Sequence, residues 1–112
     1  MLHQMKLQPE HFKYMQNGTK RIELRLNDEK RKTIQLGDEI EFLKEPKCEE
    51  SFKVKVVGLL RYENFSDLIK DFDMEVLADS SVTKEELLNE LQKFYSIEKQ
   101  KEYGVLGIRI EK

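Results

Sequence analysis

Apolar and charged residues alternate along residues 52–60, FKVKVVGLL, and this alternation limits the possible folds more than any other feature of the chain. Phe52, Val54 and Val56 alternate with Lys53 and Lys55, and β-branched residues are frequent. A period of two is typical of a β-strand with one buried face. Shorter segments with strand character are predicted at residues 4–7, 20–26, 39–42 and 103–112. The second follows the helix-stop pair Asn17-Gly18, and the third is entered through a turn at Gly37-Asp38.

Helical patterns separate the predicted strands. PEHFKYMQNG, residues 9–18, predicts a helix that has Pro9 in its first turn. NFSDLIKDFD predicts a short amphipathic helix capped by Ser66, and residues 83–95 begin with a capping box formed by Thr83 and Glu86. Residues 96–103 predict a further helical turn. The order of elements favours an α+β fold, a small and mostly antiparallel β-barrel or curled sheet with flanking helices.

The chain has 112 residues, which predicts one domain over residues 1–112. Its net charge is −2, which argues against a protein that tracks the phosphates of long duplexes. The charge is uneven, because residues 18–32 carry six cations and three anions, whereas residues 63–102 carry five lysines and eleven acids. The sequence shows no signal-peptide pattern and no apolar run that could cross a membrane, and Cys48 is the single cysteine. We therefore expect a cytoplasmic protein without a disulfide.

The most informative local pattern is GTKRIELRLND, residues 18–28. Ile22, Leu24 and Leu26 predict a buried strand face, and Arg21, Glu23 and Arg25 should share the opposite face. Three interpretations of that charged face stay open: a solvated surface, a buried structural ion pair, and the wall of a binding cleft.

Each residue type in this segment suits a binding cleft. Gly18 frees the backbone at the end of the helix, and Lys20 offers a flexible point charge to an anion. Arg25 has a planar fork that can grip phosphate or stack on a base. Nearby cations should keep Glu23 ionised, so that it accepts hydrogen bonds from a base edge and does not act as a general acid.

Gly18, Lys20, Glu23 and Arg25 have the spacing G-x-K-x-x-E-x-R, and with it the chain resembles the ASCH domain family of the PUA-like superfamily. The resemblance runs from about Met5 to Glu111 and includes MKLQPEHF, Arg61-Tyr62 and the C-terminal FYS…YGVLGIRI. It implies a PUA-like β-barrel with a cleft walled by the motif. It also implies RNA or a nucleotide-like small molecule as partner, and places Ser96 near the cleft as a polar contact.

The resemblance also raises an enzymatic alternative. Some small bacterial relatives are amidohydrolases that remove an acyl group from a modified cytidine, using a threonine in the motif strand, a lysine and a later glutamate. Here Lys20 matches that lysine, but Glu23 occupies the position expected for the threonine. Lys20 and Glu23 would be the catalytic pair, with Glu23 activating water as a general base.

A third hypothesis is a protein-interaction module whose acidic helices, residues 65–95, dock a basic partner. No cofactor is expected, and no metal site, because His3 and His11 lack other ligands at suitable spacing. His11 is interpreted as a residue on the surface or boundary of its helix. Tyr95 is interpreted as a packing residue, and Glu85, Glu86 and Glu90 as a solvated helix face.

Overall fold

A computed structural model describes residues 1–112. One sheet contains five strands in the order β1-β3-β4-β5-β2. The strands are β1 (Leu2–Leu7), β2 (Ile22–Leu26), β3 (Glu39–Lys44), β4 (Ser51–Tyr62) and β5 (Val105–Glu111). The helices are α1 (Pro9–Gln16), α2 (Phe65–Lys70), α3 (Met74–Leu77), α4 (Lys84–Phe94) and α5 (Ile97–Tyr103), with a 3-10 turn at Arg31–Thr33.

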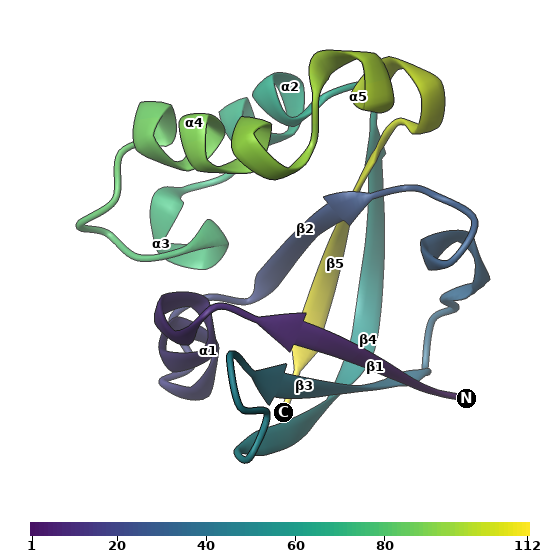
Figure 1. The fold of residues 1–112 in the computed structure, drawn as a ribbon, viewed down its shortest axis with the longest axis vertical. Coiled ribbons are helices and arrows are strands. Elements are labelled where there is room, and N and C mark those ends of the chain that lie inside the picture. The colour runs from purple at the N-terminus through teal and green to yellow at the C-terminus, as the bar shows by residue number, and fades with distance from the viewer.

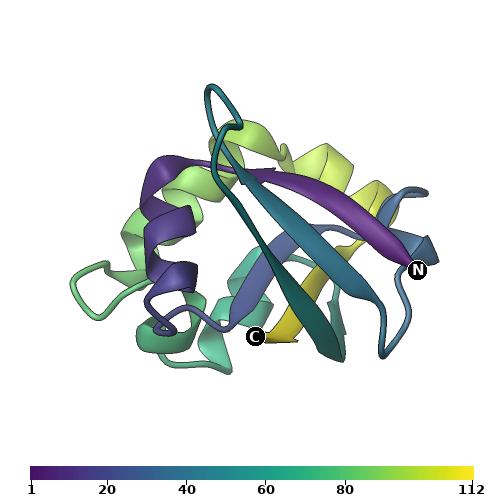
Figure 2. The ribbon, with the colours of Figure 1, turned by 90° about the horizontal axis from the view of Figure 1, so that it is seen from below.

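The sheet curls into a half-barrel (Figures 1 and 2). β1 and β3 are parallel, and the other three neighbouring pairs are antiparallel. The α+β class and the PUA-like, mostly antiparallel architecture predicted from the sequence are therefore confirmed. β1 and β2 each have a neighbour on one side only, so both are edge strands.

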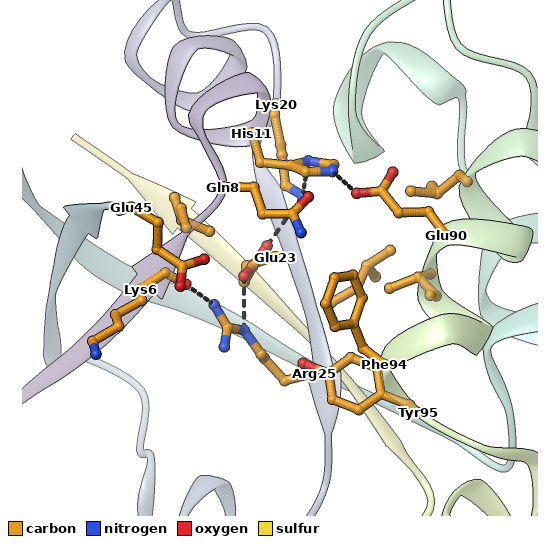
Figure 3. A pocket seen from close by; sticks show the side chains of 14 residues that line it. Lys6, Gln8, His11, Lys20, Glu23, Arg25, Glu45, Glu90, Phe94 and Tyr95 are labelled. Atoms are coloured by element: carbon orange, nitrogen blue, oxygen red, sulfur yellow. Dashed lines mark hydrogen bonds and ion pairs between the residues drawn. The ribbon is translucent and has the colours of Figure 1, made fainter. Parts of the chain in front are cut away.

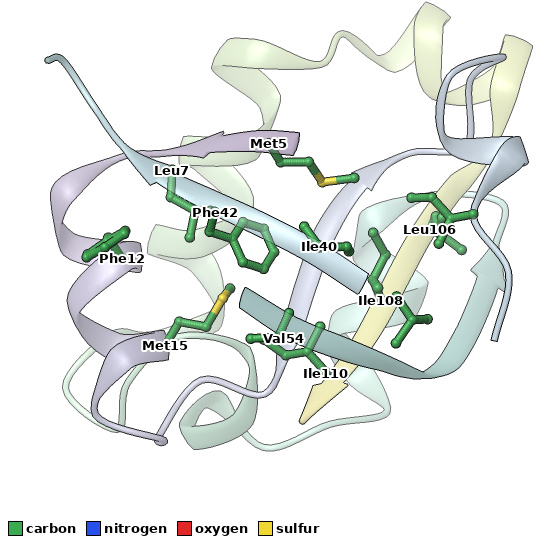
Figure 4. Close-up of a cluster of buried hydrophobic side chains, with 12 residues drawn as sticks. Met5, Leu7, Phe12, Met15, Ile40, Phe42, Val54, Leu106, Ile108 and Ile110 are labelled. Carbon is green, nitrogen blue, oxygen red and sulfur yellow. The ribbon is translucent and has the colours of Figure 1, made fainter. Parts of the chain in front are cut away.

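Alternating apolar side chains fill the concave face of the half-barrel. Ile40 lies opposite Val54, and Val56 lies opposite Ile110, so the predicted period-two positions meet across the strands. Figure 4 shows this cluster closed at one end by residues of α1. Its members are Met5, Leu7, Phe12, Met15, Ile34, Ile40, Phe42, Val54, Val56, Leu106, Ile108 and Ile110.

A second apolar cluster lies on the other face, beneath helices α2, α3 and α4. Ile22, Leu24 and Leu26 of β2 point into it, as their alternation predicts. Figure 1 shows these helices and α5 gathered on one side of the sheet. β2 therefore lies between two cores, and its remaining side chains face the concave side. None of the helices has the length and apolar composition needed to span a bilayer.

Helix caps agree with the sequence in one place and differ in another. Thr83 accepts a hydrogen bond from Glu86 N, and Glu86 accepts one from Thr83 N, so the predicted capping box is confirmed. The cap predicted at Ser66 is wrong. Asn64 is extended and accepts from Asp67 N at 2.8 Å, so α2 begins before Ser66.

Candidate functional site

A cavity of about 260 Å³ opens at the free edge of β2, between α1 and α4. Figure 3 shows the side chains of the start of α1, of β2 and of the end of α4 converging on it. The lining comprises Lys6, Leu7, Gln8, His11, Lys20, Glu23, Leu24, Arg25, Glu45, Leu87, Glu90, Leu91, Phe94 and Tyr95. Segments far apart in the sequence therefore form one hollow.

The register of β2 on β5 sets the direction of the charged side chains. Glu23 pairs with Ile108, and Arg25 pairs with Leu106. Paired residues share a sheet face, so Glu23 and Arg25 lie on the concave side next to apolar core residues. Arg21 lies just before the strand begins at Ile22, is exposed and does not line the cavity.

Lys20, Glu23 and Arg25 form a buried ionic group. Lys20 Nζ lies 3.1 Å from Glu23 Oε1, and Arg25 Nε donates to Glu23 Oε2 at 2.8 Å. Lys20 is 3% exposed and Glu23 is 4% exposed. Two cations and one anion give this group a net charge of +1, and Lys6, Glu45 and Glu90 bring the whole lining to three cations and three anions.

Burial and charge oppose one another at Glu23. Burial alone would raise the pKa of its carboxyl, but the charges of Lys20 and Arg25 outweigh burial and lower the pKa from 4.5 to about 2. Burial likewise opposes the charged form of Arg25, yet the Glu23 carboxylate raises the pKa of the guanidinium. Glu23 is therefore ionised at neutral pH and accepts hydrogen bonds.

His11 extends the group toward α4. Lys20 Nζ donates to His11 Nδ1 at 2.9 Å, and His11 Nε2 lies 3.1 Å from Glu90 Oε1. An ammonium group has no acceptor, so Nδ1 is unprotonated and Nε2 carries the proton that it donates to Glu90. Burial, and then the Lys20 charge, lower the pKa of His11, although Glu23 and Glu90 act against them. His11 is partly buried at the boundary of its helix, as predicted, but its contacts with Lys20 and Glu90 were not predicted.

Arg25 also connects the two edge strands. Its Nη2 donates to the backbone carbonyl of Lys6 in β1 at 2.6 Å. β1 and β2 lie at opposite ends of the strand order, so this bond crosses the open side of the half-barrel. The ionic group is thus partly structural, because it holds the walls of the cavity at a fixed separation.

The sequence matches the ASCH domain over residues 5–112. The chain belongs to the ASCH domain family. This family is generally associated with RNA binding. The chain is similar to hypothetical protein PH0355, whose crystal structure is known: the two sequences are 36% identical, and the TM-score is 0.87 over 99% of this chain and 98% of that one. The solution structure of protein PF0455 from Pyrococcus furiosus is 34% identical, with a TM-score of 0.78 over 99% of this chain and 96% of that one. No curated protein matches the sequence.

Three of the motif residues of this ASCH domain gather at the cavity and two predicted residues do not. Lys20, Glu23 and Arg25 line it, whereas Gly18, which follows α1 two residues after its end, has a φ of 84° and lies outside the lining. At that φ a side chain would be strained, so glycine serves the turn into β2. Ser96 is exposed, and its hydroxyl caps α5 by accepting from Lys99 N. It does not line the cavity.

Two aromatic residues at the end of α4 complete the cavity wall. Phe94 is 58% exposed, which is unusual for so large an apolar side chain. Tyr95 is half-buried and lies 5.6 Å, between ring centroids, from Phe65. Tyr95 therefore packs on the helical core, as predicted, and also contributes to the cavity.

The sequence contains a pattern that indicates which residues of α4 line the cavity, and interpreting Glu90 as part of a solvated helix face overlooked it. Leu87, Glu90, Leu91 and Phe94 stand at i, i+3, i+4 and i+7, which is one face of a helix. The interpretation of Glu90 as part of a solvated face is therefore wrong, because this residue faces His11. A charged residue inside an apolar helical stripe indicates a partner on the element opposite.

Proposed function

We propose that this ASCH domain binds a nucleotide-sized group in the cavity, either one base of single-stranded RNA with its phosphate or a free nucleotide. The observation that carries the proposal is the meeting of a buried cationic group with an exposed aromatic side chain around one hollow. Lys20 and Arg25 supply the cationic group, and Phe94 supplies the aromatic ring.

The ionic group retains hydrogen-bonding capacity. Arg25 has five N–H donors, of which the bonds to Glu23 and Lys6 use two. Each Glu23 oxygen receives one bond, from Lys20 or Arg25, and a carboxylate oxygen can accept two. Donors and acceptors therefore stand side by side, and base edges present the same mixture.

The aromatic wall supports the same ligand class. RNA-binding proteins recognise unstacked bases by stacking them on aromatic side chains, and each stack contributes about 1–3 kcal/mol. Phe94 leaves most of its surface in water, so a ring laid on it would bury apolar area on both partners. A cavity of about 260 Å³ is smaller than typical pockets for drug-sized ligands, which suits a single ring.

The amidohydrolase hypothesis is less well supported by the geometry. Glu23, with a pKa of about 2, is too weak a base to take a proton from water efficiently at neutral pH. The third hypothesis, an interaction module, would use the outward acidic faces of α2 and α4, whose apolar faces are occupied by the second core.

Binding measurements on two variants test the proposal. The four ribonucleoside 5′-monophosphates and a short single-stranded RNA would be titrated by calorimetry into the wild-type protein, Phe94→Ala and Arg25→Lys. We expect at least one probe to bind, Phe94→Ala to weaken it about tenfold, and Arg25→Lys, which keeps the charge but loses the fork, to weaken it further. Ile97→Ala removes an exposed apolar side chain outside the cavity and should bind like wild type.

Two results would contradict the proposal. One is the absence of measurable binding for every probe. The other is binding that neither Phe94→Ala nor Arg25→Lys changes. Circular dichroism of each variant would show that the fold is intact.

A further inference from the structure

We infer that the unpaired backbone N–H and C=O of Leu24, on the free edge of β2, bind the ligand. They would form two hydrogen bonds with a flat ring that presents an N–H donor beside an acceptor. This inference rests on the proposed function and specifies how the cavity recognises a base. It assigns recognition to a main-chain N–H and C=O, and the motif side chains then contribute around that contact.

Two hydrogen bonds fix which residues of β2 are bonded to β5. Ile110 N donates to Arg21 O at 2.9 Å, and Asn27 N donates to Gly104 O at 3.0 Å. Both bonds lie in the register that pairs β2 with β5, one just before the strand and one just after it. In an antiparallel ladder, hydrogen-bonded and non-bonded pairs alternate.

The alternation assigns the residues between these two bonds. Glu23 and Arg25 occupy hydrogen-bonded positions, so their backbone groups point to β5. Leu24 occupies a non-bonded position opposite Gly107, so its N–H and C=O point away from β5. β2 is an edge strand, and therefore no neighbouring strand meets these two groups.

Leu24 brings the unpaired groups to the cavity. Leu24 is 4% exposed, and it is one of the residues that line the hollow. None of the backbone hydrogen bonds outside the regular helices and strands reaches its N–H or C=O, and the alternation of the β2–β5 ladder leaves both groups unbonded to β5. A buried backbone donor and acceptor without partners is costly, and native proteins leave few of them. A ligand that supplies both partners would recover that free energy.

The geometry selects the ligand edge. In an extended residue, N–H and C=O point to the same side of the strand, and an antiparallel partner exchanges two hydrogen bonds with them. A heterocycle with a donor next to an acceptor can make the same pair of bonds, as nucleobase edges do. The side chains of Glu23 and Arg25 flank Leu24 in sequence and would contact the ring substituents.

An added peptide strand fits this edge less well than a ring does. A strand would need several consecutive edge positions, but Ile22, the preceding one, is fully buried. On the other side of Leu24, the Arg25 guanidinium is bonded to Lys6 O and so lies across the space between β2 and β1 (Figure 3). The edge is thus open to a ligand at one residue, which suits a compact ring.

The direct test replaces one backbone amide by an ester. Incorporating the α-hydroxy counterpart of leucine at position 24 removes the N–H and keeps the side chain. The matched control is the same replacement at Leu26, which is the next outward-pointing position of β2 and does not line the cavity. The probe is whichever ribonucleoside 5′-monophosphate binds the wild-type protein most tightly. We expect about tenfold weaker binding for the ester at position 24, and wild-type binding for the ester at position 26.

A second measurement uses the unaltered protein. With leucine labelled by nitrogen-15, adding the same monophosphate should move the Leu24 amide proton downfield and slow its exchange, with smaller changes at Leu26. Wild-type affinity of the position 24 ester, or an unmoved Leu24 amide at saturation, would overturn the inference. If Phe94→Ala still weakened binding in that case, the proposed function would stand. If no probe bound the wild-type protein, the proposed function would fail and this inference with it.

Discussion

Replacing Glu23 by glutamine tests how the ionic group of the cavity is held together. Glutamine has nearly the same shape, but it leaves the positive charges of Lys20 and Arg25 without a counter-charge in a place that water hardly reaches. Lowering the pKa of Glu23 from 4.5 to about 2 corresponds, at about 1.4 kcal/mol per pH unit, to about 3 kcal/mol of stabilisation. Breaking a buried ion pair by removing one partner costs roughly 3–5 kcal/mol in other proteins. We therefore expect Glu23→Gln to lower the free energy of unfolding by about 3 kcal/mol at pH 7.

The effect should depend on pH in a defined direction. The folded-state pKa of Glu23 lies below the unfolded-state value, so the unfolded chain binds the proton more readily. The carboxylate therefore stabilises the fold fully above about pH 4.5, and this contribution is lost as the pH falls to about 2. The difference between the two proteins should shrink over that window.

Denaturant unfolding followed by circular dichroism measures both quantities. Wild type and Glu23→Gln would be compared at pH 7 and at several values between pH 5 and pH 2. Glu39→Gln, which changes an exposed strand glutamate, is the control and should alter stability by less than about 0.5 kcal/mol. A Glu23→Gln effect as small as that of Glu39→Gln at pH 7, or one that grows as the pH falls, would refute the reasoning.

Two further predictions concern His11 and the start of α2. Burial and the neighbouring Lys20 hold His11 neutral, so nitrogen NMR should show the Nε2–H tautomer at pH 7 and a pKa below 6.5. A charged ring at pH 7 or protonated Nδ1 would contradict the proton assignment. Asn64→Ala should lower the free energy of unfolding by about 1 kcal/mol in thermal melts, because it removes the cap on Asp67 N. Ser66→Ala is the control. A loss of stability for Ser66→Ala equal to or larger than that for Asn64→Ala would show that Ser66, and not Asn64, caps the helix.

The strands and the long helix were predictable because their signals are local. Period-two alternation marked residues 52–60, which lie within β4, and the apolar positions Leu106, Ile108 and Ile110, which lie in β5. The capping box at Thr83 and Glu86 marked the start of α4. These patterns need a few neighbouring residues only, and the packing of the fold reinforces them. The four-residue helix α3 and the 3-10 turn at Arg31–Thr33 carry too few residues to show a period, and the sequence did not predict them.

One part of the cavity lining was predictable for the same reason. Lys20, Glu23 and Arg25 lie within six residues of one another, and strand geometry brings them together. His11 and Glu90 are separated by 79 positions in the sequence, and their contact depends on how α4 packs beside α1. Each of them, taken alone, resembles an ordinary surface residue. Spacing along the chain therefore could not reveal the pair, although the helical face shared by Glu90 and Phe94 marked one partner.

Stability alone does not explain why Lys20, Glu23 and Arg25 form a buried ionic group, because burying charges has a desolvation cost. Well-packed apolar residues often replace a buried ion pair with no loss of stability. Apolar residues at positions 23 and 25 would extend the concave core, close the cavity and leave an apolar edge strand that invites aggregation. Inward-pointing charges on β2 avoid that pairing, and they also hold open the hollow into which Leu24 presents its backbone. Under the proposed function, the same two side chains would protect the edge from other chains and leave it free for a ligand small enough to enter.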